Sequence, residues 1–202
     1  MSKNTIIHSA KSLFLKFGIK SISMDDIAKD IGMSKKTIYN FVTNKDDLVL
    51  SVLQSFIEEE KEIVSHIKSH ANNAIEEMAS IGKYVIQTMR KMKPTLTHDL
   101  KKYHVKSWDF LNKDHFSFIE DIIKSNINRG INEGLYRSEL DPEIQAKIYV
   151  GLARLIVEEE VFPIKKYERP HIYENVFMYN MNGIMNDKGR KEIKKYLKQD
   201  NL

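Results

Sequence analysis

The sequence has 202 residues, 42% hydrophobic and 30% charged, with a formal net charge of +4 at pH 7, values ordinary for a globular protein with a buried core. Only 8 glycines and 4 prolines are present, which disfavours a many-stranded β fold and favours helices. The absence of cysteine excludes disulfides and thiolate chemistry, and no apolar run reaches the roughly 18–20 residues of a membrane span, so we expect a soluble, cytoplasmic protein without membrane association.

The first predicted element is an amphipathic helix over residues 3–17. Its apolar residues recur at the three- and four-residue spacing of one buried helix face, and they are Ile6, Ile7, Ala10, Leu13, Phe14 and Phe17. Gly18 follows, and glycine commonly closes a helix because it adopts positive φ angles at little cost. The pattern therefore predicts a helix that ends at Gly18.

Three further helices are predicted between residues 23 and 70. Ser23 and Asp26 have the spacing of a capping box, which starts the second helix, and Gly32 interrupts it after about two turns. Ser34 caps a third helix that runs to about Phe41. A fourth, longer helix begins near residue 44 or 45, and its apolar side carries Leu48, Val52, Phe56, Ile63 and Ile67.

The remainder of the chain is also predicted to be helical. Helices are expected at about 72–92, 95–111, 114–133, 142–160 and 171–187. Pro94, Pro142 and Pro170 lie where helices begin, and Gly134 lies where one ends. The expected fold is all-α with about nine helices. An N-terminal helix-turn-helix domain is expected over residues 1–45, followed by a helical ligand-binding and dimerisation domain over residues 46–202.

The second and third helices have the pattern of a helix-turn-helix. Seven positions agree with the packing of two short helices across a turn: apolar Ile27, Ile31, Met33, Ile38 and Phe41, small Ala28, and Gly32 in the turn. The exposed side of the third helix presents side chains that can hydrogen-bond to phosphates or base edges, namely Lys35, Lys36, Thr37, Tyr39 and Asn40. A solvated face over a helical core is the alternative, but the coincidence of the two patterns favours DNA binding.

The run from Ser21 to Leu48, SISMDDIAKDIGMSKKTIYNFVTNKDDL, strongly resembles the DNA-binding domain of the tetracycline-repressor (TetR) family. The resemblance covers about residues 5–50; the rest matches in length, helical character and the stretch from Gly130 to Pro142. It implies that Thr37, Tyr39 and Lys45 hold phosphates and that Lys35, Lys36 and Asn40 lie against the groove, with Ser23 and Ser34 completing the DNA-binding set. Lys36 departs from the small residue or proline often found there, and Val42 replaces a frequent aromatic residue.

The resemblance also implies a homodimer and a small-molecule pocket in the C-terminal helices. The last two long helices have apolar stripes that suit a four-helix bundle with a partner, although periodicity alone fits an intramolecular core equally well. Candidate pocket residues are soft or aromatic, which suits an apolar or aromatic effector, although core packing explains each one singly; they are Met78, Tyr84, Met89, Tyr103, Trp108 and Phe116.

No catalytic, cofactor or metal site is predicted. His66 and His70 have metal-ligand spacing, but no third ligand can be identified and helix-surface histidines are common. The leading hypothesis is therefore a repressor that binds a double-stranded DNA operator and is released by a small effector, not an enzyme. The alternative is a helix-turn-helix regulator without a small ligand, controlled by a protein partner or acting as an activator.

Overall fold

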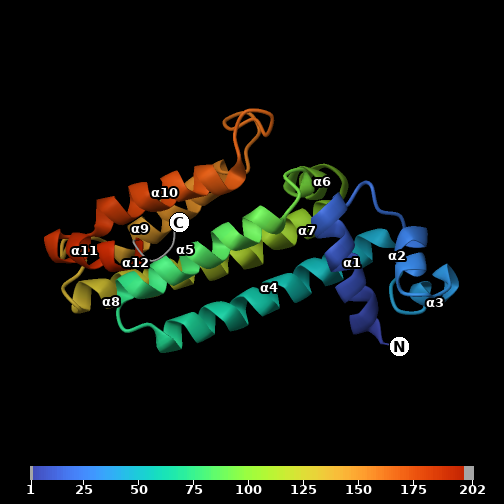
Figure 1. Ribbon diagram of the computed structural model, residues 1–202, viewed down its shortest axis with the longest axis horizontal. Coiled ribbons are helices and arrows are strands. Elements are labelled where there is room, and N and C mark those ends of the chain that lie inside the picture. Colours follow the sequence, from blue (N-terminus) through green and yellow to red (C-terminus); the bar gives the residue numbers. More distant parts are fainter. Residues whose placement is uncertain (1, 198–202) are drawn as a thin grey trace. The chain divides into compact units, whose positions relative to one another are not determined.

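The computed structural model describes residues 2–197, which are mainly helical and contain one isolated bridge, between Tyr136 and Met185 (Figure 1). In chain order the elements are α1 (Lys3–Phe17), α2 (Met24–Asp30), α3 (Lys35–Tyr39), α4 (Lys45–His70), α5 (Ala74–Lys91), α6 (Leu96–Tyr103), α7 (Val105–Phe110), the π-helix η1 (Leu111–His115), α8 (Phe116–Asn132), α9 (Pro142–Leu155), α10 (Arg169–Ile184), α11 (Asp187–Glu192) and α12 (Lys194–Leu197). The predicted all-α fold is confirmed.

Contacts divide the chain into two compact units. The first unit comprises Met1–Glu62 and Lys91–His115, and the second comprises Ile63–Arg90 and Phe116–Leu202. The boundary that we predict after residue 45 divides the chain by function instead of by contacts, and it stays a prediction. No helix within residues 2–197 is long and apolar enough to cross a membrane.

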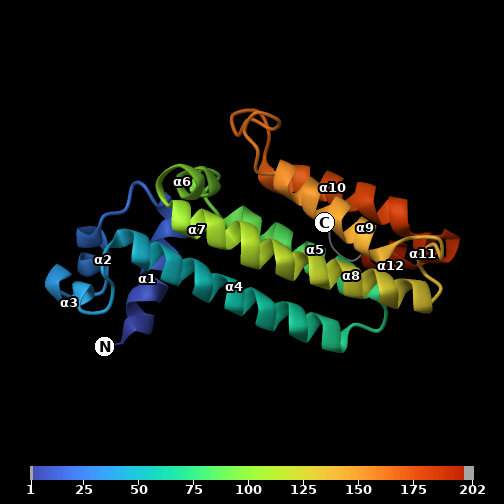
Figure 2. The same cartoon turned by 180° about the vertical axis from the view of Figure 1, so that it is seen from behind.

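The first unit is built around one apolar cluster. Ile6 and Phe14 of α1, Ile27 of α2, Ile38 of α3 and Leu48 of α4 are all buried in it. Lys11 on α1 forms an ion pair with Glu59 on α4, and α1 lies across this part of α4 (Figures 1 and 2). The α1 helix ends at Gly18, whose φ of 86° is positive, as the sequence predicts. This packing fixes the framework on which α2 and α3 are held.

The second unit has its own core between α5, α8, α9 and α10. Met78, Ile127, Phe177 and Met181 are buried there at 1% exposure or less, and α8 packs beside α9 (Figure 2). The start of α9 follows the predicted signal, because Oδ1 of Asp141 accepts hydrogen bonds from the backbone of the next turn. Local capping and apolar periodicity thus explain most of this unit.

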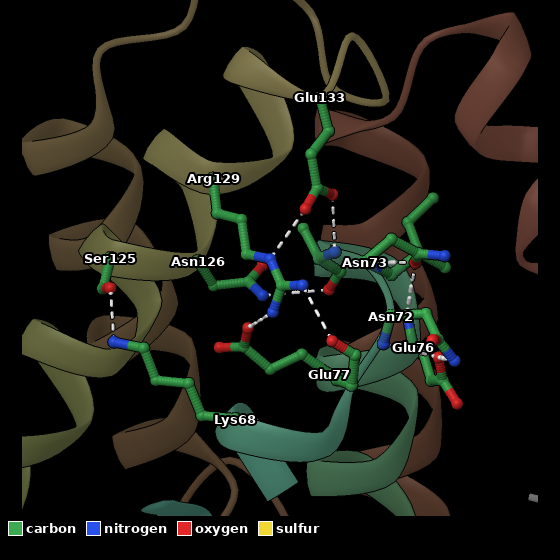
Figure 3. Close-up of polar contacts among 12 residues, drawn as sticks. Lys68, Asn72, Asn73, Glu76, Glu77, Ser125, Asn126, Arg129 and Glu133 are labelled. Atoms are coloured by element: carbon green, nitrogen blue, oxygen red, sulfur yellow. Dashed lines mark hydrogen bonds and ion pairs between the residues drawn. The ribbon is translucent and has the colours of Figure 1, made fainter.

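A polar network joins α5, α8 and the segment before α5 (Figure 3). The Arg129 guanidinium donates from Nε to Glu133, from Nη1 to Glu77 and from Nη2 to the Ala71 carbonyl, at 2.7, 2.8 and 2.8 Å. Glu77 is only 1% exposed, and its Oε1 has no hydrogen-bond partner. Because a buried carboxylate is costly unless it is paired, Arg129 is the residue that makes this position of Glu77 tolerable.

The predicted helix over residues 95–111 is divided in two. The helix is interrupted at His104, whose φ and ψ of −131° and 62° are not helical. The His104 side chain is 7% exposed, and its Nδ1 lies 2.7 Å from Oδ1 of Asp46 in the first turn of α4. A tertiary contact therefore accompanies the break, and periodicity within the segment does not reveal it.

The helix predicted over 142–160 ends earlier than expected, at Leu155. The next residues include Glu158, Glu159 and Glu160, and three negative charges at a helix C-terminus oppose the helix dipole. The guanidinium of Arg169 donates hydrogen bonds to the backbone carbonyls of Ile156 and Phe162, which are therefore satisfied without a helix. The chain between α9 and α10 consequently forms a long connection.

Gly189 is required where α11 packs on the segment that joins α8 to α9. A Cβ atom at this position would lie 2.2 Å from the Leu135 carbonyl oxygen, which belongs to the backbone. We therefore expect Gly189→Ala to lower the free energy of unfolding by about 1–3 kcal/mol, measured by urea denaturation. The control is Gly183→Ala in α10, where a Cβ meets no atom within 4 Å and where we expect a neutral or stabilising effect. Equal effects of the two substitutions would contradict the packing argument.

Candidate nucleic-acid interface

The first element of the interface, α2, begins with the predicted capping box. The Ser23 hydroxyl accepts from the Asp26 backbone N–H at 3.2 Å, and Asp26 Oδ2 accepts from the Ser23 backbone N–H at 2.8 Å. The Ser23 hydroxyl also donates to Asp26 Oδ2 at 2.6 Å, and this hydrogen bond, with the one from the Ser23 backbone N–H, lowers the pKa of Asp26. Because Ser23 and Asp26 are hydrogen-bonded to each other, the first turn of α2 has a defined conformation, as predicted.

The turn between α2 and α3 also has the predicted geometry. Gly32 has a φ of 65°, in the left-handed region that favours glycine, and the Met33 N–H donates to the Ala28 carbonyl at 2.9 Å. The Ser34 hydroxyl then accepts from the Thr37 backbone N–H at 3.1 Å and lies 2.8 Å from the Thr37 hydroxyl. The two side-chain oxygens therefore stabilise the first turn of α3 while they stay at its surface.

The third helix has one apolar side and one polar side. Ile38 is fully buried, whereas Lys35, Lys36 and Asn40 are exposed and the Tyr39 ring is 42% exposed. All four polar side chains can donate hydrogen bonds, as phosphate and base-edge recognition requires. The structure thus brings the predicted residues of α3 together on one accessible surface.

The position predicted for Phe41 is wrong. We expected its side chain to face inward, but it is 37% exposed and Val42 is buried in its place. The reason is that α3 ends at Tyr39, after which the N–H groups of Phe41 and Val42 both donate to the Ile38 carbonyl. Once the chain leaves helical geometry, the 3.6-residue periodicity no longer applies.

Lys35 forms an ion pair that the sequence pattern does not reveal. Its Nζ lies 3.0 Å from Oδ2 of Asp25 on α2, and both side chains are well exposed. The hydrogen bond from Lys35 to Asp25 raises the pKa of the lysine. A negative group thus already occupies one side of the lysine that we expected to meet DNA.

The Lys45 side chain contacts the protein backbone, unlike the exposed polar side chains of α3. Its Nζ donates to the Ile19 carbonyl at 2.6 Å, in the segment that joins α1 to α2. Partial burial of the ammonium group lowers the pKa of Lys45. The structure therefore separates Lys45 from the exposed lysines of α3 and gives it a bond that positions the entrance to the helix-turn-helix.

Asp99 is a charged residue that is buried beside the α1–α2 connection. It is 5% exposed, and its Oδ2 accepts from the Lys20 backbone N–H at 3.0 Å. Asp99 of α6 therefore stabilises the α1–α2 connection, although α6 is not part of the helix-turn-helix. No signal in the sequence marks this contact, because its partners lie 79 positions apart.

The chain is similar in sequence and in fold to known transcriptional regulators. The family model described as "Bacterial regulatory proteins, tetR family" matches residues 6–52. The uncharacterised HTH-type transcriptional regulator YvaF of Bacillus subtilis (strain 168) is 28% identical over 172 residues, 83% of this chain and 87% of that protein. A TetR-family transcriptional regulator from Agrobacterium tumefaciens has the same fold, with a TM-score of 0.72 at 15% identity over 91% of this chain and 97% of the other.

The chain matches the TetR family over residues 6–52, and its relatives and fold support a TetR-family regulator. It is accordingly a transcriptional regulator with a DNA-binding helix-turn-helix, formed by α2 and α3. A transcriptional regulator from Saccharomonospora viridis, solved in complex with choline, also shares the fold, with a TM-score of 0.72 at 16% identity over 91% of this chain and 97% of that chain.

The six candidate effector residues are distributed over both units of this TetR-family chain. Met78 and Phe116 are buried in the second unit, where Tyr84 and Met89 are half-buried. Trp108 packs against the core of the first unit. Tyr103, also in the first unit, is 40% exposed and accepts a hydrogen bond from Lys20, which lowers the pKa of its phenol. Each unit thus holds part of the predicted set, and the pocket stays a prediction.

No candidate metal centre emerges from the described part of the chain. His66 and His70 lie together on α4, with ring centroids 4.0 Å apart, and Nδ1 of His70 is 2.8 Å from the His66 carbonyl oxygen. Within residues 2–197 there is no group of three or more suitable side chains around a common point.

Proposed function

We propose that this TetR-family regulator is a homodimeric repressor that binds an operator in double-stranded DNA and is released by a small apolar or aromatic effector. The observation that carries the proposal is the polar, exposed side of α3 opposite the buried Ile38. A repressor role is further supported by the HTH-type transcriptional repressor KstR2 of Mycobacterium tuberculosis, which is 20% identical over 70% of this chain and 72% of that protein.

The proposed DNA contacts follow from where the side chains lie. Lys36 and Asn40 are assigned to base edges, because their amine and amide groups project from the exposed side of α3. Phosphate contacts are assigned to Tyr39 and to the surface hydroxyl and ammonium groups of Ser23, Ser34, Lys35 and Thr37. Lys45 already donates one of its three ammonium N–H groups to the Ile19 carbonyl, so we assign it first to holding the α1–α2 connection, and its other donors stay available for a phosphate.

The proposed dimer uses the exposed side of α9. Ile144, Ile148 and Leu155 are 55%, 47% and 41% exposed and lie on one helix face, with Gly151 between them. A Cβ at Gly151 would meet no atom within 4 Å, so a second helix can approach closely there. On α10, Tyr179 is 74% exposed. Burial of a fully exposed apolar side chain gains about 1.5–3 kcal/mol, so these half-exposed groups gain about half of that each, which favours a second copy as the cover.

Release by an effector requires that the effector bind one state of the dimer more tightly than the other. The methionine and aromatic side chains of the second unit suit an apolar or aromatic compound. The choline bound by the Saccharomonospora viridis regulator supports a small ligand for a protein of this fold. The alternative is control by a protein partner, with no small ligand.

The proposal is tested in two steps. Genomic fragments retained by the purified protein are sequenced to identify the operator, and metabolites are then screened for those that raise the melting temperature. Any compound that binds only the native state stabilises it, and an effector must also weaken operator binding. Failure to enrich any DNA sequence would refute operator recognition. Stabilising compounds that leave operator affinity unchanged would instead refute release by those compounds and favour the protein-partner alternative.

We expect operator binding to fall steeply with salt, because lysines that bind DNA replace the counterions condensed around its phosphates. Lys36→Ala is expected to relax the preference at one base pair, because we assign Lys36 to a base edge. If its Nζ also neutralises a phosphate, the substitution should in addition reduce the slope of log affinity against log salt by roughly 1. Fluorescence anisotropy between dilute and physiological salt measures both. The control is Lys194→Ala, which removes an exposed lysine of the second unit and for which we expect an unchanged salt slope. Salt-independent binding would contradict the proposed interface.

A further inference from the structure

The connection between α9 and α10, residues 156–168, is an ordered loop. Nη1 of Arg169 donates to the carbonyls of Ile156 and Phe162, and its Nη2 lies 3.8 Å from Glu159, so the two ends of the loop are held together. The rings of Phe162 and Tyr167 contact each other edge to face, with centroids 5.6 Å apart. Compact loops of this length that pack on their own side chains are frequently functional.

The same loop exposes apolar side chains. Val161 is 49% exposed and Tyr167 is 37% exposed, and the loop extends beyond the ends of α9 and α10 (Figure 1). Leu155, the last residue of α9 and part of its exposed apolar side, directly precedes it. The apolar surface proposed for dimerisation therefore continues along the chain into this loop.

Residues 158–166 of the loop separate their charges by sign, and Glu168 follows them at the N-cap of α10. Three acidic residues, 158–160, come before Val161, and Lys165 and Lys166 come after it. In a two-fold dimer each contact occurs twice with the roles exchanged, because residue i of one copy meets residue j of the other and j meets i. A loop with acids on one side of an apolar centre and lysines on the other is therefore complementary to a second copy of itself.

We propose that the loop over residues 156–168 is a second contact surface of the dimer, in which the acidic run of one copy pairs with the lysines of its partner around Val161. The proposal rests on the homodimer proposed above and adds a specific role to it. The apolar side of α9 supplies most of the affinity, whereas the loop charges supply selectivity between partners.

Charge reversal tests this pairing. One variant carries Glu158→Lys and Glu160→Lys, which keeps the contact of Glu159 with Arg169 but removes the attraction of Glu158 to the same guanidinium. The second variant carries Lys165→Glu and Lys166→Glu. Each variant alone places like charges across the two-fold axis, so we expect its dimer dissociation constant to rise about tenfold, which corresponds to about 1.4 kcal/mol. A mixture of the two restores opposite charges, so heterodimers should exceed the half expected from random exchange.

Analytical ultracentrifugation measures the dissociation constants, and native mass spectrometry measures the heterodimer fraction at low and high salt. The reversal variants should approach the wild type at high salt, where surface charges are screened. Lys191→Glu with Lys194→Glu is a matched charge change outside the loop, expected to leave dimerisation unchanged. Wild-type dimerisation of both loop variants together with random mixing would overturn the loop contact. Ile148→Glu tests the underlying dimer separately, because a dimer that survives it refutes the α9 interface itself.

Discussion

Tyr39→Ala is expected to abolish tight operator binding while the protein remains folded. The Tyr39 ring is 42% exposed at the end of α3, so its removal costs little packing. We assign its hydroxyl to an operator phosphate, and a hydrogen bond to a charged group contributes about 1.5–3 kcal/mol. Loss of that contact corresponds to an increase in the dissociation constant of roughly tenfold to more than a hundredfold, which anisotropy titration with a labelled operator measures.

Two companion variants separate binding from folding. Tyr39→Phe removes the hydroxyl alone and should reproduce most of the loss, because the phosphate contact depends on that group. Ile38→Ala removes a fully buried side chain and should instead lower the free energy of unfolding by about 2–5 kcal/mol. If Tyr39→Ala unfolds the protein to a similar extent, Tyr39 is a packing residue and its assignment to DNA is wrong.

The largest stability effect is expected from Arg129→Ala. Three donors of its guanidinium hold Glu133, Glu77 and the Ala71 carbonyl, and Glu77 is 1% exposed (Figure 3). Removal of the arginine leaves a buried carboxylate without its counter-charge, which costs about 3–5 kcal/mol. Urea denaturation should therefore show a much lower midpoint with an unchanged slope.

Replacement of both partners provides the control for this prediction. Arg129→Met with Glu77→Leu removes the charge and its partner together, so much of the lost stability should return. Lys147→Ala tests the opposite extreme, because Lys147 and Glu143 pair at 2.7 Å with more than half of each side chain exposed. That substitution should change stability by no more than about 0.5 kcal/mol. Equal effects of Arg129→Ala and Lys147→Ala would refute the importance of burial here.

Local signals in the sequence predict much of the fold. The capping box at Ser23, the turn at Gly32 and the helix start at Asp141 all depend on residues within four positions of one another. Their hydrogen bonds form within one turn of chain, so the residue types alone determine them. The exposed side of α3 was predictable for the same reason, because Ile38 fixes which side is buried.

Long-range contacts account for what the sequence could not predict. The hydrogen bond from Lys45 to the Ile19 carbonyl was not predictable, while its phosphate contact stays a prediction. The burial of Asp99 was not predictable either, because its partner is the Lys20 backbone N–H. The break at His104 coincides with its contact with Asp46, 58 residues earlier. Each of these partners is known only once the helices are packed, and no periodic pattern encodes the pairing.

The ion pair between Lys35 and Asp25 gives DNA binding the character of an exchange reaction. In the free protein the Asp25 carboxylate occupies, 3.0 Å from the ammonium group, a place that a phosphate oxygen would take. A phosphate at the contact that we propose for Lys35 competes with this carboxylate, so we expect a smaller net gain from that contact on any DNA sequence. Contacts to base edges face no such competitor. With the contacts proposed above, we therefore expect the Asp25 carboxylate to weaken attachment to unrelated DNA more than operator recognition, and to shorten the time that the regulator spends on unrelated DNA.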